Sequence, residues 1–172
     1  MEVKIRKARL LDANAIWQIN RDNWKHVFCD VYSKERIENV LKRKLARDDE
    51  KKLRDGVRKG YRYYVAVSGG KVAGALIYKK KGRIINVGFL YVDIKRHGNG
   101  IGTALVNYLE RKERAQTYTL TAASRKQTIK FYEKMGYRKL RSVKTREGDT
   151  DIIMIKRVDV SNKYKQRKLA SR

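Results

Sequence analysis

The sequence predicts a mixed α/β domain with a central, twisted and mostly antiparallel sheet of about seven strands and helices on both faces. Segments with apolar residues at helical spacing are followed by segments with the shorter period of strands. Two adjacent glycines at 69–70 lie between two strand segments, which is a short hairpin signal. The expected order is a strand, two or three helices, three strands, then a helix, a strand, a helix and two strands.

The N-terminal part of the chain is predicted as one strand followed by helices. Residues 3–8 alternate in polarity like a short strand. A helix is expected over 12–28, with Asp12 as its N-cap because a short acidic side chain can accept from the free N–H groups of a first turn. Further helices are expected over 33–46 and over the charged segment that ends near residue 59.

From residue 61 onward the apolar period becomes that of strands, interrupted by two helices. A single domain is expected, because the sequence has no proline, no long Gly/Ser linker and no internal repeat. The predicted strands are 61–68, 71–80, 84–93, 117–123, 136–143 and 150–158, and the predicted helices are 101–114 and 124–135.

The charge of the chain is its most unusual compositional feature. The formal net charge is +26 over 172 residues. Such a field attracts polyanions, whether nucleic acid, an acidic protein, an anionic membrane or phosphorylated small molecules. The positive residues are spread along the chain, so a solvated basic surface is the alternative interpretation. Residues 1–158 are expected to fold as one domain, and 159–172 to form a flexible basic tail.

Cysteine content and hydropathy indicate a cytoplasmic protein. Cys29 is the single cysteine, so no internal disulfide can form. No apolar run approaches the roughly 18 residues that cross a bilayer, and the N-terminus lacks the apolar core of a signal peptide. Cys29 lies one helical turn from His26, but two ligands do not make a zinc site, so no metal is expected.

A glycine-rich loop, "HGNGIG" at 97–102, follows a predicted strand and opens a predicted helix. Unpaired N–H groups and the positive end of the helix dipole make such a position an anion-binding site. A nucleotide P-loop is excluded, because no lysine follows Gly102. The dinucleotide fingerprint fails as well, because the loop lies in mid-chain and no acidic residue follows about 20 positions later. A tight turn without a ligand is the alternative.

The wider context of the loop resembles the GCN5-related N-acetyltransferase (GNAT) family. "FLYVDIKRHGNGIGTALVNYLE" contains the family's loop pattern [QR]-x-x-G-x-[GA], with His97 in the place of the usual Arg or Gln. About thirty residues later, "TIKFYEKMGYRKL" contains its aromatic-Tyr and Gly-aromatic pairs. The resemblance extends over about residues 2–158 and implies the GNAT fold, in which two neighbouring strands splay apart.

The resemblance implies acetyl-CoA as cosubstrate. Its pantetheine arm would pair with the strand end before the loop, and the loop amides would bind its pyrophosphate. Arg125 stands where the family often has Asn, and an arginine there could reach a CoA phosphate. The residues assigned to acetyl-CoA on this basis are Leu90, Tyr91, Val92, His97, Gly98, Asn99, Gly100, Ile101, Gly102, Thr103 and Arg125.

The resemblance also implies direct attack of an amine on acetyl-CoA, which creates two proton transfers. Tyr132 matches the family's usual general acid; a core tyrosine is the alternative. Some relatives carry a glutamate base in the strand, but that position is Asn86 here and 84–92 holds no carboxylate. His26 and Asp30, near the end of the first helix, are the candidate bases, and release of the proton to water is the other alternative.

The leading hypothesis is therefore an N-acetyltransferase with an undefined primary amine as acceptor. The positive field favours a protein N-terminus or lysine over a small polycationic amine. The second hypothesis is a fold of this family that binds nucleic acid with weak or no catalysis. The third is a family member that holds CoA without transfer. The sequence leaves homodimerisation undecided.

Overall fold

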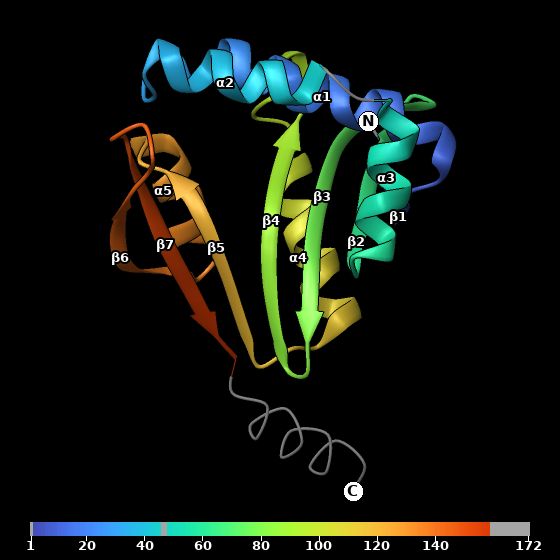
Figure 1. Cartoon of the computed structure of the whole chain (residues 1–172). Helices are drawn as coiled ribbons and strands as arrows, with labels where there is room; N and C mark the ends of the chain where they lie inside the picture. Colours follow the sequence, from blue (N-terminus) through green and yellow to red (C-terminus); the bar gives the residue numbers. More distant parts are fainter. Residues whose placement is uncertain (1, 46–47, 159–172) are drawn as a thin grey trace, which may run out of the picture.

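The computed structural model describes residues 2–45 and 48–158. A seven-stranded sheet with the order β1-β2-β3-β4-β5-β7-β6 runs through the molecule (Figure 1). All neighbouring strands are antiparallel except β4 and β5. The strands are β1 (Lys4–Lys7), β2 (Tyr61–Ser68), β3 (Lys71–Lys81), β4 (Ile84–Val92), β5 (Thr117–Ala123), β6 (Arg138–Lys144) and β7 (Thr150–Arg157). The predicted mixed α/β fold is confirmed.

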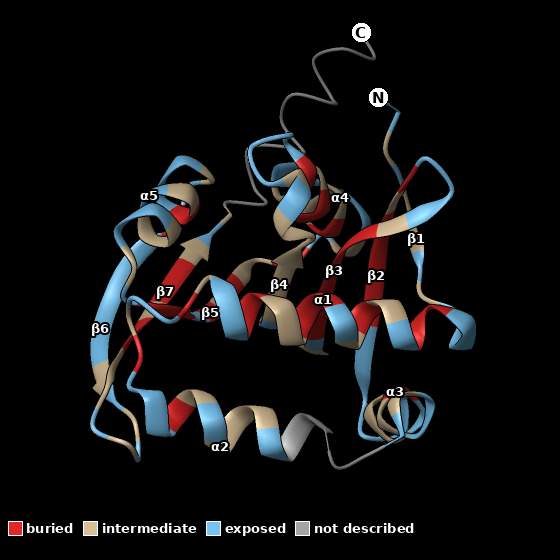
Figure 2. Cartoon of the chain, turned by 90° about the horizontal axis from the view of Figure 1, so that it is seen from above, coloured by how far each residue is buried: buried red, intermediate tan, exposed pale blue. Residues whose placement is uncertain are grey.

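Helices cover both faces of the sheet, as the sequence predicts. Figure 2 shows α1, α2 and α3 on one side of the strands and α4 and α5 on the other. The helices are α1 (Ala13–His26), α2 (Lys34–Leu45), α3 (Asp49–Arg58), α4 (Ile101–Glu113) and α5 (Lys126–Lys134), with 3-10 turns at η1 (Leu10–Asp12) and η2 (Ile94–Arg96). The basic tail predicted for 159–172 lies outside the described residues.

The two faces of the sheet bury separate apolar clusters. On one face, Leu105 and Leu109 of α4 pack on Leu76 of β3, all without exposed surface. On the other, Ile16 of α1 packs on Val65 of β2. Gly74 in β3 allows α4 to approach closely, since a Cβ there would lie 3.0 Å from the Ile101 side chain. The start of α4 is therefore held firmly against the sheet.

Asp12 precedes α1 as predicted, but its carboxylate does not cap that helix. It accepts from Arg6 at 2.6 Å and from the backbone N–H of Arg9 at 2.6 Å. The reason is the short 3-10 turn η1, which puts Asp12 in helical conformation and turns its side chain toward β1. At α2, the Ser33 hydroxyl does accept from a first-turn N–H, that of Arg36, at 3.3 Å.

Candidate active site

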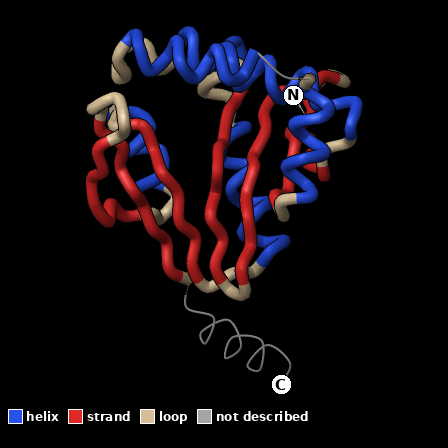
Figure 3. The backbone as a smooth tube through the Cα atoms, viewed as in Figure 1, coloured by secondary structure: helices blue, strands red, loops and turns tan. Residues whose placement is uncertain are grey.

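The parallel strands β4 and β5 pair over only part of their length. Their register extends from Ile84 and Thr117 to Val87 and Leu120, and beyond it the strands diverge (Figure 3). The divergence begins at Gly88, which is the extra residue of a bulge against β3. A bulge bends its strand and increases the local twist. The upper half of β4 therefore has a partner strand on one side only.

The glycine loop lies directly beyond the free end of β4. Gly98 and Gly100 have φ angles of +81° and +73°, a left-handed conformation that suits glycine and costs other residues about 1–2 kcal/mol. The first helical hydrogen bond of α4 joins the Ala104 N–H to the Gly100 carbonyl at 2.9 Å. The N–H groups of residues 101–103 consequently have no partner within the helix and face outward at its positive end.

A cavity of about 670 Å³ joins the gap between the strands to this loop. Its walls come from the end of α1, the end of β4, the loop and first turn of α4, and the exposed face of α5. The lining residues are Asn23, Val27, Phe28, Leu90, Tyr91, Val92, Arg96, His97, Gly98, Gly100, Ile101, Gly102, Thr103, Arg125, Gln127, Thr128, Lys130, Phe131, Tyr132 and Lys134. An open strand edge and a helix N-terminus thus share one cavity.

The structure brings most of the sequence-predicted site residues to this cavity. All the residues assigned to acetyl-CoA line it except Asn99, and the proposed acid Tyr132 lines it as well. The two candidate bases lie outside the lining, and both His26 and Asp30 are exposed. Cys29 is also exposed, and its thiol faces the His26 carbonyl at 3.8 Å rather than the imidazole.

Tyr132 is the ionisable residue most deeply enclosed by this cavity. It is 8% exposed, and its ring packs edge-on against Phe131 at 5.0 Å and Tyr137 at 5.6 Å. Burial raises the pKa of the Tyr132 hydroxyl well above its ordinary value of about 10, and the nearby Tyr91 raises it further. Tyr132 therefore keeps its proton throughout the neutral range.

Residues of α1 hold the free end of β4, and the sequence analysis did not identify them. The Asn23 amide donates to the Val92 carbonyl at 2.9 Å, and the Trp24 indole donates to the Tyr91 hydroxyl at 3.1 Å. The His97 ring lies 3.1 Å from the same Val92 carbonyl. The available signal is that Asn23 falls on the apolar face of α1, where a polar residue needs a specific partner.

Arg125 and Asp30 join the two walls of the cavity mouth. The Arg125 guanidinium donates to the Asp30 carboxylate at 3.0 Å, which connects the start of α5 to the segment after α1. The Asp30 side chain is 54% exposed, so the pair contributes little to stability. The contact instead orients the Arg125 guanidinium at the cavity mouth.

A buried polar cluster supports the other side of the gap. Asp151 of β7 accepts from the Tyr32 hydroxyl at 2.6 Å and from the Arg36 guanidinium at 2.8 Å. The Arg36 guanidinium also stacks on the Tyr32 ring, 3.7 Å from its centroid. Asp149 accepts from the Ser33 hydroxyl at 3.0 Å. These contacts fix the beginning of α2 against β7.

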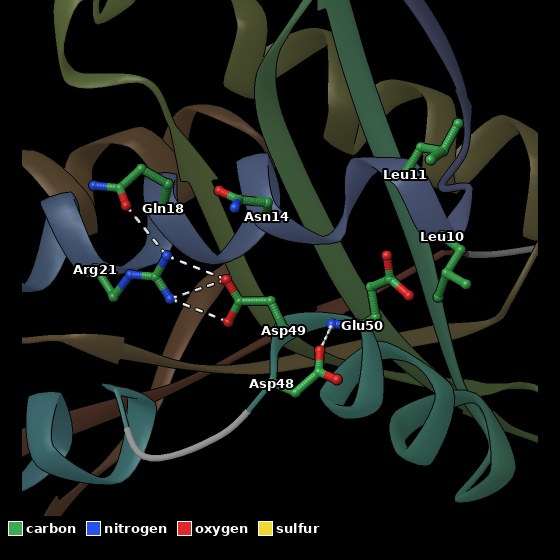
Figure 4. Close-up of a pocket in the computed structure, with 8 residues that line it drawn as sticks. All are labelled: Leu10, Leu11, Asn14, Gln18, Arg21, Asp48, Asp49 and Glu50. Atoms are coloured by element: carbon green, nitrogen blue, oxygen red, sulfur yellow. Dashed lines mark hydrogen bonds and ion pairs between the residues drawn. The ribbon is translucent and has the colours of Figure 1, made fainter.

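A second cavity, of about 790 Å³, lies between α1 and α3 on the side away from the glycine loop (Figure 4). Its carboxylates already have partners: Asp49 is paired with Arg21 at 3.1 Å, and Asp48 caps α3 by accepting from the Glu50 N–H. Over residues 2–45 and 48–158, no cluster of three or more His, Cys, Asp or Glu side chains is arranged to hold a metal. The described helices include none long and apolar enough to cross a membrane.

The fold is shared with several solved N-acetyltransferases. PaiA N-acetyltransferase from Thermoplasma acidophilum, solved with coenzyme A, is 23% identical and has a TM-score of 0.75, with 92% of this chain and 100% of that chain covered. A GCN5-related N-acetyltransferase from Rhodopseudomonas palustris is 24% identical and has a TM-score of 0.74, with 92% of this chain and 97% of that chain covered. The ribosomal-protein-S18-alanine N-acetyltransferase from Escherichia coli is 18% identical and has a TM-score of 0.69, with 92% of this chain and 96% of that chain covered.

Sequence comparison identifies the family. Residues 28–158 match the acetyltransferase (GNAT) domain. Because the match extends over more than half of the chain, the protein belongs to the GNAT acetyltransferase family, and the resemblance drawn from the two motifs is confirmed. No curated protein sequence is significantly similar to this chain.

Proposed function

We propose that the protein transfers the acetyl group of acetyl-CoA to a primary amine by direct attack of the amine on the thioester carbonyl. One observation carries the proposal: a single cavity contains the free edge of β4, the unpaired N–H groups of α4 and a protonated tyrosine. The extended pantetheine arm can pair with the strand edge as a neighbouring strand would. The thioester that the cosubstrate supplies then lies near Tyr132.

The glycine loop fits the pyrophosphate of acetyl-CoA. A Cβ built on Gly98 or on Gly100 meets no atom within 4 Å, so the space beside both residues is free. The N–H groups at 101–103 have no partner within the helix, and the positive end of the helix dipole favours an anion beside them. Arg125 bonds to Asp30 through its Nε, and its remaining guanidinium N–H groups can donate to a further phosphate.

Tyr132 is the proposed proton donor to the departing sulfur. The amine nitrogen forms the new bond to the carbonyl carbon as the carbon–sulfur bond breaks, and the electron pair remains on sulfur. Burial raises the pKa of Tyr132, and it equally disfavours a bare thiolate at the same place. The sulfur takes the tyrosine proton as the carbon–sulfur bond breaks, and Tyr132 then regains a proton from solvent. The proton released by the amine passes to solvent, since His26 and Asp30 lie outside the cavity lining.

A protein N-terminus or lysine is the proposed acceptor, in preference to a polycationic small amine. A polycation requires free carboxylates around the site. Three carboxylates near the gap are already occupied within the chain: Asp30 by Arg125, Asp149 by Ser33, and Asp151 by Tyr32 and Arg36. The net charge of +26 repels a polycation further.

The test is acetyl transfer to a peptide panel and to spermidine, measured by mass spectrometry, with Tyr132→Phe and Tyr137→Phe as a matched pair. Tyr137 is also buried in the same aromatic group, but its hydroxyl has no hydrogen-bond partner among the described residues. We expect Tyr132→Phe to lower kcat at least tenfold with unchanged acetyl-CoA binding, and Tyr137→Phe to leave kcat within twofold. Acetyl-CoA binding without turnover on any amine would contradict the transferase proposal, and equal effects of the two variants would refute the acid role.

A further inference from the structure

The end of the sheet opposite the cavity collects basic side chains from segments far apart in the sequence. The turn between β3 and β4 meets the start of β5, because the Gln116 N–H donates to the Arg83 carbonyl at 2.9 Å. The end of β7 joins them through the Val158 N–H and the Gln116 carbonyl at 2.8 Å. Lys80 binds the Glu113 carbonyl at 2.9 Å and thereby brings in the end of α4. All four segments meet at the lower end of the molecule in Figure 1.

Six exposed cations at this place form what we call the basic end: Lys79, Lys81, Arg83, Arg111, Lys112 and Arg157. Within residues 2–45 and 48–158, no carboxylate lies at ion-pair distance from any of the six.

The nearby acids do not neutralise the basic end. Glu113 is bonded to Lys80 at 3.1 Å and to Arg62 at 3.2 Å, and its side chain is only 9% exposed. Glu110 is bonded to Lys156 at 2.8 Å. The field outside this surface is therefore strongly positive, and it favours a polyanion whose binding releases condensed counterions.

An exposed aromatic side chain beside the basic end favours nucleic acid over other polyanions. Tyr61 is 37% exposed, and the Lys79 ammonium lies 5.3 Å from the centre of its ring. A ring beside a phosphate-binding cation is the arrangement that stacks a nucleic-acid base. Attachment to a membrane by apolar insertion would need a contiguous apolar patch, whereas the exposed large aliphatic residue in the segments of the basic end is Ile84.

We propose that the basic end binds single-stranded nucleic acid, with the cations on the phosphodiester backbone and Tyr61 stacked on a base. The cations lie at the end of β4 away from the glycine loop, and Tyr61 contacts the middle of this strand, since a Cβ on Gly88 would lie 3.9 Å from its ring. β4 extends from Ile84 at the basic end to Val92 at the glycine loop, which corresponds to about 26 Å at about 3.3 Å per residue. The phosphate-binding cations and the glycine loop therefore lie at opposite ends of β4, and this proposal does not depend on acetyl transfer.

The experiment is fluorescence anisotropy of the full chain with a labelled 20-nucleotide single-stranded RNA, titrated at several salt concentrations. With about five phosphate contacts, log K should fall against log [salt] with a slope of about −3.5. Lys81→Gln, Arg83→Gln and Arg111→Gln are combined in one variant. The matched control removes three exposed charges from the outer strand β6, through Arg138→Gln, Lys139→Gln and Arg141→Gln. Thermal unfolding of both variants verifies folding.

We expect the basic-end variant to bind the RNA at least 30-fold more weakly and to reduce the slope of log K against log [salt] by about 2. The β6 control should change the affinity for the RNA less than threefold. Tyr61→Ala should weaken binding about tenfold without changing the slope, because stacking releases no counterion. Equal losses in the two triple variants would overturn the proposal. So would binding to anionic phospholipid vesicles or to polyglutamate that equals or exceeds binding to RNA.

Discussion

Replacement of Gly100 separates the role of the glycine loop in folding from its role in binding. Gly100 has a φ of +73°, and a Cβ built there meets no protein atom within 4 Å. The cost of Gly100→Ala to the free energy of unfolding is therefore the backbone strain alone, about 1–2 kcal/mol. If the pyrophosphate of acetyl-CoA occupies this space, the new methyl group collides with it, and the affinity for acetyl-CoA falls at least tenfold.

Gly70 provides a control with nearly the same backbone geometry. It lies in the turn between β2 and β3 with a φ of +74°, and its Cβ position is equally free of contacts. Gly70→Ala should consequently destabilise the fold by a similar amount, about 1–2 kcal/mol, while acetyl-CoA binding remains unchanged. The difference between the two variants isolates the contact with the cosubstrate from the strain.

The assay combines denaturant unfolding with calorimetric titration of acetyl-CoA. A tenfold loss of affinity corresponds to about 1.4 kcal/mol, which titration resolves. ATP and NAD serve as controls for general attraction to a basic surface. If Gly100→Ala and Gly70→Ala bind acetyl-CoA within twofold of each other, the loop does not hold the pyrophosphate, and the assignment based on its N–H groups is wrong.

Three further predictions concern the surroundings of the site. Asp151→Asn removes the carboxylate that pairs with the buried Arg36 cation at 2.8 Å and leaves Asp149, at 4.0 Å, as its carboxylate partner, so we expect the free energy of unfolding to fall by about 2 kcal/mol, measured by urea denaturation. The hydrogen bond from Arg6 lowers the pKa of Asp12 in the folded protein. The ionised Asp12 therefore contributes its full stabilisation of the fold above the ordinary pKa of about 3.9, and this contribution is lost as the pH falls through the lower pKa of the folded state. Arg6→Met should therefore flatten the acid limb of the stability–pH curve, and an unchanged limb would exclude this pair as its cause. Arg125→Ala should weaken acetyl-CoA binding severalfold, with a smaller loss at high salt, whereas a salt-independent loss would argue against a phosphate contact.

Local patterns in the sequence were sufficient to predict the strands and α-helices of the described residues, but not the 3-10 turns η1 and η2. The change from helical to strand spacing near residue 61 depends on neighbouring residues only, and β2 does begin at Tyr61. The glycine loop is equally local, because the left-handed angles at Gly98 and Gly100 require glycine. The prediction that the Asp12 carboxylate caps α1 was wrong, because this carboxylate accepts a hydrogen bond from Arg6 of β1 instead.

The shape of the site depends on contacts that no local pattern contains. The gap opens at Gly88, but the bulge there exists only relative to the register with β3. Tyr32 and Asp151 are 119 positions apart, and Asn23 and Val92 are 69 apart. The net charge predicted a polyanionic partner, but it did not indicate which surface of the protein would bind that partner. The basic end arises from the topology, which brings four separate segments to one edge.

The free end of β4 is an unpaired strand edge that other elements of the fold enclose. Beyond Gly88 the strand pairs with β3 only, and an accessible edge of this kind can recruit another chain. Here Phe28 of the segment after α1 lines one side of the gap and Tyr132 of α5 lines the other, so the edge lies inside a cavity of about 670 Å³. A strand within a second sheet needs a spacing of about 4.8 Å and further strands beside it, which these walls exclude. A single extended chain needs no further strand beside it, so the enclosure of this edge agrees with the proposed pairing of the pantetheine arm.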